Sequence, residues 1–465
     1  MQKVAMTIWA AALTVAAIVA ILLANVFAGF GISLSMILAA VLWTGVLLST
    51  YVWAPAIPSG SDAESAVPEK PKNKPGGGRQ VWVDSLKTFL MCLVVVGHSG
   101  VAFLGLGWYL TIGWYPNFYR AIGTAVFVLV KSFAVPLFFF ISGTFAPSSC
   151  DKKGPSAFLK TLVWRMSLPF FVFTFIVDAG LNTAANSAFR DPPLPISYLP
   201  SLGVTWFLLW LMLFSSVYAH LEGPKMFMDL PSIGTLNLIS FGVSVLQLGV
   251  DVTLGIFAAS PAFMGMPLVG PGNGLHNALW YAGGTLAGRN GWLSDRLPRG
   301  MRTVSAGVAG VSAVLVFVAA LLLLPENPVI NVGGDPSLLF FLFVIVCQVL
   351  LAPAGICLGV LAIDLFQQLC TDQEGILNRL APFSYGVFLL HSWVVVVITF
   401  SFIKIYEGAT GTDISWPDGP GGSTTRLSND GVLFGGFLYT AVLSLGASVL
   451  LTFLVRLIPG VKSFL

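Results

Sequence analysis

The sequence predicts an all-α, polytopic transmembrane helical bundle. Of its 465 residues, 56% are hydrophobic and only 9% are charged, and the mean hydropathy is +0.87. A soluble domain carries about 25% charged residues, so a chain this apolar needs lipid as the solvent for most of its surface. The apolar residues also fall into runs of roughly 20, the length of a spanning helix. We therefore expect a ten-helix core preceded by a two-helix hairpin.

Composition divides the chain into three segments. Residues 1–53 carry two apolar runs, near 5–29 and 33–53. The first run is longer than the apolar region of a signal peptide and the second follows at once, so we interpret them as a retained transmembrane hairpin. Residues 54–80 are rich in Pro, Gly, Ser and charge, which is typical of a flexible cytosolic linker. Residues 81–465 form the ten-span domain.

The ten-span domain contains ten apolar runs. They lie near residues 84–106, 122–145, 157–182, 203–221, 232–257, 273–289, 302–324, 337–366, 380–403 and 432–457. The Gly and Pro content of the stretch 232–275 allows a broken or re-entrant segment there. We find no repeat of fixed period along these runs.

Lys and Arg residues gather in alternate loops, and this asymmetry predicts the orientation. One set of loops carries Lys152, Lys153, Lys160, Arg289, Arg296, Arg299, Arg302, Arg379 and Arg456. The opposite set carries only Arg120, Arg190, Lys404 and Arg426. Because short cytosolic loops are enriched in Lys and Arg, we expect the first set to be cytosolic, together with both termini.

Charge and cysteine content exclude two classes of protein. The net charge of +3 is small and scattered, which argues against nucleic-acid binding. The five cysteines form no Cys-x-x-Cys pair, so neither a disulfide framework nor a metal site is predicted.

The first core run carries three polar side chains on one helix face. Lys87 and His98 are eleven residues apart, close to three turns, and Asp84 lies one turn before Lys87. At 1.5 Å of rise per residue, His98 sits roughly 16 Å deeper than Lys87. Because ionisable side chains inside spans are usually functional, we interpret this stripe as part of a site. The alternative is a buried structural His98 with Lys87 snorkelling to the interface.

Two other spans carry basic side chains at depth. His391 lies about eleven residues into its span, a depth close to that of His98, so the two histidines suggest a shared polar cavity. A purely structural His391 is the alternative. Lys131 needs a partner or a wet cavity. It either stabilises a developing oxyanion, holds an anionic group of the acceptor, or forms a structural ion pair with Asp178 or Asp251.

Seven motifs follow one another in order along residues 81–465. They are Asp84-x-x-Lys87 with His98, FFFISG ending in Ser142 and Gly143, DKKG with a stretch from Arg165 to Pro169, Trp206-Phe-Leu, a Gly-x-x-x-x-Arg-x-x-Trp-Leu turn from Gly284, a Ser-Tyr-Gly stretch before His391, and a tail from Arg456 to Gly460. In this order they resemble the acyltransferase family 3 membrane enzymes. Within that family the chain looks closest to the branch containing glucan biosynthesis protein C.

The resemblance implies an integral membrane O-acyltransferase. Such an enzyme moves an acyl group, of the acetyl or succinyl class, from cytosolic acyl-coenzyme A to a hydroxyl of a glycan or similar acceptor, and needs no metal. The coenzyme would meet Arg165, Lys160 and Arg289, with Ser142 among its contacts. The family usually carries a second arginine three residues before Arg165, where this chain has Leu162.

His98 is the expected general base, because an imidazole titrates near neutral pH and can take the proton of an alcohol. An acyl-His98 intermediate is a second route, in which the imidazole carries the group across the membrane. Asp84 is expected to pair with Lys87, since opposite charges three residues apart on a helix are neighbours. Lys87 would then steer the coenzyme.

The remaining predicted site residues would act around this base. His391 or Lys131 would polarise the thioester carbonyl or place the acceptor, and Trp206 would contact the acceptor. The main alternative is a multi-pass transporter or flippase, because intramembrane His and Lys also build substrate and proton pathways. A binding or scaffold protein is a third reading. The paired broken helices of many transporters are not evident in the sequence.

Overall fold

The computed structural model describes residues 80–104, 118–187, 202–221, 228–253, 262–263, 266–267, 274–323, 338–370, 374–411 and 429–461. The hairpin predicted over 1–53 and nearly all of the linker predicted over 54–80 lie outside these residues. Only the ten-span domain can therefore be compared with its prediction.

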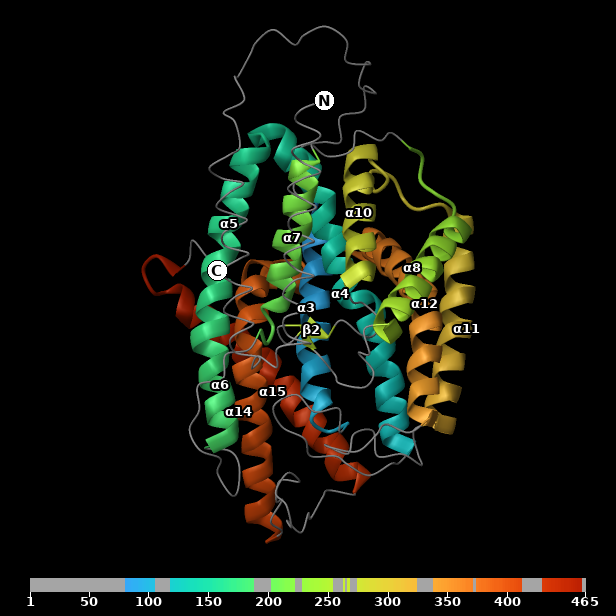
Figure 1. Ribbon diagram of the computed structural model, residues 1–465. Coiled ribbons are helices and arrows are strands. Elements are labelled where there is room, and N and C mark those ends of the chain that lie inside the picture. The colour runs from blue at the N-terminus through green and yellow to red at the C-terminus, as the bar shows by residue number, and fades with distance from the viewer. Residues whose placement is uncertain are drawn as a thin grey trace, which may run out of the picture.

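The described residues are almost entirely helical (Figure 1). The longer helices are α3 (Val81–Val101), α4 (Phe118–Lys153), α5 (Pro155–Val172), α7 (Trp206–His220), α8 (Ile233–Thr253), α10 (Gly274–Asn290), α11 (Arg299–Leu323), α12 (Leu338–Leu369), α14 (Ser384–Thr410) and α15 (Asp430–Arg456). The shorter pieces are the π-helix η1 (Phe173–Val177), α6 (Asp178–Ser187), α13 (Ile376–Leu380) and the 3-10 turn η2 (Ala381–Phe383). Strands β1 (Ala262–Phe263) and β2 (Met266–Pro267) form a two-residue antiparallel pair.

The all-α membrane fold predicted from composition is confirmed. Each of the ten predicted core runs overlaps a helix, and among the described residues seven helical segments are long and apolar enough to cross a membrane. The stretch 232–275, where a break was allowed, contains α8 and, after it, the strand pair. The run predicted near 157–182 is not one regular helix, because the wider turn of η1 joins α5 to α6. The chain is an integral membrane protein.

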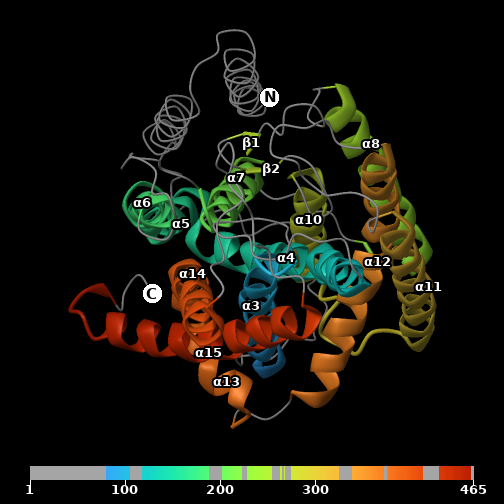
Figure 2. The ribbon, with the colours of Figure 1, turned by 90° about the horizontal axis from the view of Figure 1, so that it is seen from below.

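Helix α3 lies in the middle of the bundle. Figure 2, a view along the bundle, shows α4, α14 and α15 next to it, and all three contact it. Its side chains Leu86, Leu90 and Val95 are completely buried. The stripe that begins at Lys87 therefore belongs to a helix enclosed by protein on most sides.

Small residues let α4 and α10 approach at backbone distance. A Cβ atom on Gly143 of α4 would overlap the carbonyl oxygen of Tyr281. Likewise, Cβ atoms on Gly284 and Gly288 of α10 would overlap carbonyl oxygens of α4. Close backbone contact through small residues four apart is a common way for membrane helices to associate. The motifs around Gly143 and Gly284 thus form the contact between these helices.

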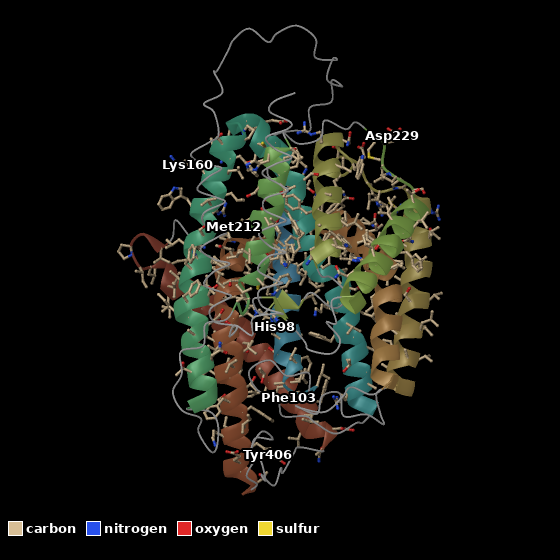
Figure 3. The ribbon with its side chains drawn as sticks, in the orientation of Figure 1. His98, Phe103, Lys160, Met212, Asp229 and Tyr406 are labelled. Carbon is tan, nitrogen blue, oxygen red and sulfur yellow. The ribbon has the colours of Figure 1, made fainter. Side chains whose placement is uncertain are left out.

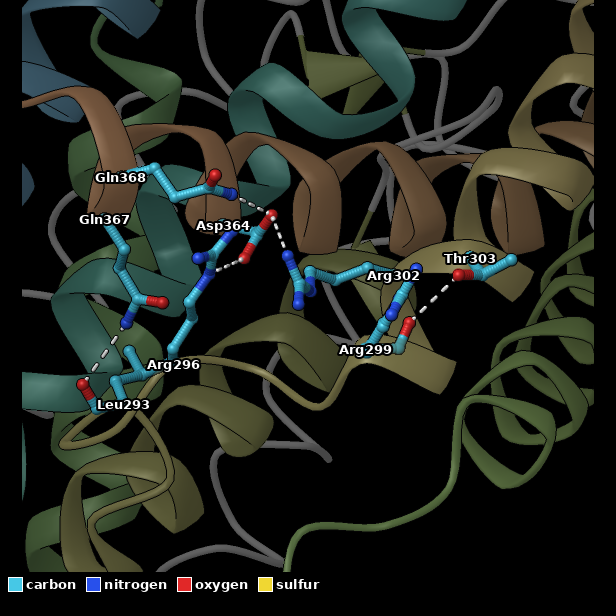
Figure 4. Close-up of polar contacts among 8 residues, drawn as sticks. All are labelled: Leu293, Arg296, Arg299, Arg302, Thr303, Asp364, Gln367 and Gln368. Atoms are coloured by element: carbon cyan, nitrogen blue, oxygen red, sulfur yellow. Dashed lines mark hydrogen bonds and ion pairs between the residues drawn. The ribbon is translucent and has the colours of Figure 1, made fainter.

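Ion pairs hold the segment between α10 and α11 against α12 (Figure 4). Asp364 of α12 accepts from Arg296 at 3.2 Å and from Arg302 at 3.5 Å. The same carboxylate accepts a hydrogen bond from Gln368 at 2.5 Å. The side chain of Asp364 is only 10% exposed, whereas that of Arg296 is 50% exposed. The predicted basic cluster here is therefore held by one nearly buried carboxylate.

Replacing Asp364 by Asn should destabilise the protein. The change leaves Arg296 and Arg302 without their anion, and we expect a loss of about 1–2 kcal/mol in the free energy of unfolding, since the half-exposed arginine contributes little. Thermal unfolding of purified protein in detergent measures the change. Asp295→Asn is the matched control, because Asp295 is exposed in the same segment. Equal unfolding temperatures for the two variants would contradict the prediction.

Candidate functional site

Two histidines from helices far apart in the sequence meet inside the bundle. His98 of α3 and His391 of α14 are joined by a hydrogen bond of 2.8 Å between Nδ1 of His98 and Nε2 of His391. Their rings are stacked, with centroids 5.0 Å apart and planes inclined by 21°. The two histidines, which the sequence places at similar depths, are thus in direct contact, and the shared polar cavity stays a prediction.

A backbone carbonyl determines which ring nitrogens of this pair carry protons. Nδ1 of His391 lies 2.7 Å from the carbonyl oxygen of Phe388. A carbonyl oxygen only accepts, so Nδ1 of His391 carries the proton and its Nε2 must be the acceptor. Nδ1 of His98 then donates to that nitrogen. In the neutral pair, Nε2 of His98 is left with the lone pair, which is the position of a base.

The two imidazoles differ in burial. His391 is 0% exposed, whereas His98 is only half-buried. Lys131 of α4 lies close enough to His98 to interact with it electrostatically. In Figure 3, His98 lies between the end of the bundle marked by Lys160 and the end marked by Tyr406. The more exposed member of the pair therefore lies between the two ends of the bundle, with the lysine side chain of α4 close by.

Helices α3 and α14 are held in register on the side of the pair nearer their N-termini. The hydroxyls of Thr88 and Ser384 are hydrogen-bonded at 3.1 Å. Between this contact and the histidines, Met91 and Val95 of α3 pack in one buried cluster with Val387 of α14. A polar contact, an apolar layer and the histidine pair therefore follow one another along the interface of the two helices.

The predicted stripe on α3 begins among aromatic side chains. The Nζ atom of Lys87 lies 4.8 Å from the centroid of the Phe145 ring of α4, within cation–π range. Thr88 donates to the carbonyl oxygen of Asp84 at 3.0 Å. The expected pairing of Asp84 with Lys87 stays a prediction.

The predicted coenzyme residues are not gathered at one point. Arg289 donates to the Tyr218 hydroxyl at 2.8 Å and lies 3.5 Å from the Asp151 carboxylate. Lys160 and Arg165 are exposed on α5. These contacts place Arg289 against α7 and the end of α4, whereas the two α5 residues project from a different helix.

Of the predicted coenzyme residues, Arg165 lies near α14, the helix that carries His391. It interacts electrostatically with the Tyr385 hydroxyl, which is buried at the start of α14. Leu162, at the position where the family usually has an arginine, packs instead in an apolar cluster with Phe170 and Met212. Ser142, the residue directly before Gly143 of the α4–α10 contact, is half-buried.

The two predicted acceptor residues lie in different surroundings. Trp206 packs against Phe139 with ring centroids 6.5 Å apart, at the start of α7. Lys131 does not form the suggested ion pair with Asp178, because neither oxygen of Asp178 has a hydrogen-bond partner among the described residues. The other suggested partner, Asp251, has a side chain outside the described part of the chain.

Several residues of this region were not predicted. Ser384 and Tyr385 lie near the start of the run that contains His391, and their place in a Ser-Tyr-Gly motif was the available signal. Trp393 donates from Nε1 to the carbonyl oxygen of Val177 at 3.0 Å, which joins α14 to η1. Nothing in the sequence indicated this contact, because it depends on which helices are neighbours.

The order of the motifs agrees with a comparison to known families. A family model described as an acyltransferase domain, the acyltransferase 3 model, matches residues 80–457. The chain belongs to the acyltransferase 3 family. Comparisons with curated proteins and with solved structures gave no match. The family match begins just before α3 and ends just after α15, so it covers every helix in the described part of the chain.

Family membership makes this protein a membrane acyltransferase, which requires an acyl donor and an acceptor. Within the described ranges, no group of three or more His, Cys, Asp or Glu side chains is placed to hold a metal ion. The strongest arrangement of chemically active side chains in this acyltransferase is the His98–His391 pair with the nearby Lys131.

Proposed function

We propose that this acyltransferase transfers an acyl group from cytosolic acyl-coenzyme A to a hydroxyl group of a glycan or similar acceptor, with His98 as the general base. The observation that carries the proposal is the hydrogen-bond chain from His98 through His391 to the Phe388 carbonyl. This chain leaves Nε2 of the half-buried imidazole as a proton acceptor.

In the proposed step, the acceptor hydroxyl gives its proton to Nε2 of His98 while its oxygen attacks the thioester carbonyl carbon. A carbon–oxygen bond forms, the carbon–sulfur bond breaks, and the proton passes from His98 to the sulfur that leaves. Proton removal by a positioned base supplies about 10²–10⁴-fold of rate in such reactions. The Lys131 ammonium lies close to His98, where it would stabilise negative charge on the thioester oxygen.

The donor would approach from the end of the bundle that carries most of the basic residues. Two of these residues are held by helix-end contacts: Arg289 joins the ends of α10 and α4, and Arg456 donates to the Pro382 carbonyl beside the start of α14 at 2.7 Å. Since basic loops face the cytosol and acyl-coenzyme A is anionic and cytosolic, we assign this end to the cytosol. Arg165 and Lys160 would bind phosphates there.

Purified full-length protein in detergent tests the donor directly. Acetyl-CoA and succinyl-CoA are supplied separately with a lipid and glycan extract, and release of coenzyme A thiol is followed with mass spectrometry of the acceptors. We expect thiol release and an acylated product with one of the two donors. If neither coenzyme A thioester is consumed while other acyl donors are, the proposed donor is wrong.

His391 should act by orienting His98. Replacing His391 by Phe keeps a ring but removes the acceptor nitrogen, and we expect transfer to slow on the order of 10–100-fold, as when a partner that orients a histidine is removed. His391→Gln keeps an acceptor oxygen and should retain more activity. His276→Gln is the control, since His276 is a buried histidine that bonds Ser240 instead. Equal activity of the Phe and Gln variants would contradict this role.

A further inference from the structure

Asp178 is a buried carboxyl group that the proposed chemistry does not use. It is the first residue of α6, is 0% exposed, and has no hydrogen-bond partner for either oxygen within the part of the chain that the structure describes. A carboxyl group in such a place is unfavourable unless something donates to it. A buried polar group without a partner in a native protein calls for a physical reason.

The backbone around this carboxyl is shaped to leave room for it. Gly203, at the start of the turn before α7, has a φ angle of +42°, and a Cβ atom there would overlap the oxygens of Asp178. One turn before Asp178, Thr174 is hydrogen-bonded to Thr205 of the same turn at 2.7 Å. The carboxyl is thus enclosed between α6 and the turn that leads to Trp206.

The π-helix η1 ends directly before Asp178. Turns of this kind are rare and are frequent at functional sites, because the extra residue changes which side chains face inward. The carbonyl oxygen of Val177, the last residue of η1, accepts the hydrogen bond from Trp393. This irregular segment is therefore joined to the helix that carries His391.

The position of the carboxyl relative to the histidine pair suggests its partner. Trp393 follows His391 by two residues, about 3 Å of rise along α14, on the side away from the helix start at Ser384. Trp393 bonds Val177, the neighbour of Asp178, and its ring would touch a Cβ atom on Gly180 at 3.5 Å. Asp178 therefore lies at a depth close to that of the histidine pair. It is slightly farther than the pair from the basic end of the bundle.

We propose that Asp178 binds the acceptor, with its buried carboxyl oxygens accepting hydrogen bonds from hydroxyl groups of a polyhydroxylated molecule that enters from the side opposite to the donor. This inference rests on the proposed function. A carboxylate accepts through two oxygens and so can hold neighbouring hydroxyls of one sugar ring. Trp206, next to Thr205, would supply an apolar face to the same ring.

Binding of methyl glycosides to purified full-length protein tests the proposal without requiring turnover. Quenching of tryptophan fluorescence is a suitable readout, because Trp393 bonds the carbonyl oxygen of Val177, the residue directly before Asp178. For the wild type we expect saturable quenching by at least one of methyl glucoside, methyl galactoside and methyl mannoside. Asp178→Leu should abolish it, and Asp178→Asn should raise the half-saturating concentration at least tenfold. Asp430→Asn, on α15, is the control and should bind as the wild type does.

A second measurement separates acceptor binding from a structural role. The variants should unfold at the same temperature as the wild type or higher, because a buried carboxyl without a partner is replaced. A lower unfolding temperature with unchanged glycoside binding would instead assign Asp178 to stabilising the N-terminus of α7 and overturn the proposal, as would absence of quenching in the wild type. Glycoside binding without cleavage of any coenzyme A thioester would overturn the donor proposal alone.

Discussion

His98→Ala should abolish acyl transfer while leaving a folded protein. The hydrogen bonds of the chain His98–His391–Phe388 leave Nε2 of the imidazole as a proton acceptor, and removal of a general base costs about 10²–10⁴-fold in rate. The ring is half-buried, so its loss should leave packing of α3 largely intact. Initial rates of coenzyme A release and of product formation, measured on purified protein at matched concentration, give the effect.

Two controls make this result specific. His276→Gln changes a buried histidine outside the pair and should stay active, and the elution volume and unfolding temperature of His98→Ala should match the wild type. The intact mass of the wild type, recorded after mixing with acyl-coenzyme A alone, separates base catalysis from an acyl-His98 intermediate. An adduct that is absent from His98→Ala would favour the intermediate. Transfer by His98→Ala at the wild-type rate would remove His98 from the mechanism.

Gly284→Ala should strongly destabilise the bundle. The added methyl group would overlap the carbonyl oxygen of Phe140 and lie within 3.0 Å of its Cα atom, so α10 and α4 must separate. Overpacking of this kind costs about 1–3 kcal/mol, and more when backbone has to move. We expect a large fall in unfolding temperature and in the yield of folded protein, measured by thermal unfolding and by chromatography in detergent.

Gly283→Ala is the matched control for this change. It is the same substitution in the same helix, but the new Cβ atom would meet only the Phe140 ring at 3.9 Å, an ordinary contact. The two variants gain the same helix propensity from replacing glycine by alanine. Similar unfolding temperatures for Gly284→Ala and Gly283→Ala would show that the close approach of α4 and α10 does not limit stability.

Much of the fold was predictable because it depends on local composition. A run of apolar residues long enough to span lipid must satisfy its own backbone hydrogen bonds, and a helix does this within one segment. This is why α3, α4 and α11 were expected at their observed places. The π-helix η1 was not predictable, because one residue inserted into a helix leaves the amino-acid composition of the segment unchanged.

The candidate site was predictable only in part. The periodicity of a helix puts Lys87 and His98 on one face of α3, and the motif order indicated His391. Neither periodicity nor spacing indicates which helix lies opposite, so the bond between the two imidazoles and the contact of Thr88 with Ser384 came from packing. Asp178 could be seen as an intramembrane acid, but the sequence suggested a lysine as its partner, which the structure does not support.

The sequence by itself determined that this protein is embedded in a lipid bilayer and is built of helices, because both properties follow from runs of apolar residues. It also indicated a membrane acyltransferase, because the family's motifs occur in order along the chain. The tertiary structure decided which polar side chains meet. Packing of α14 against α3 brought His391 to His98 and, through the Phe388 carbonyl, set which nitrogen carries the proton. Such contacts join residues almost three hundred positions apart, where no local pattern in the chain can specify them.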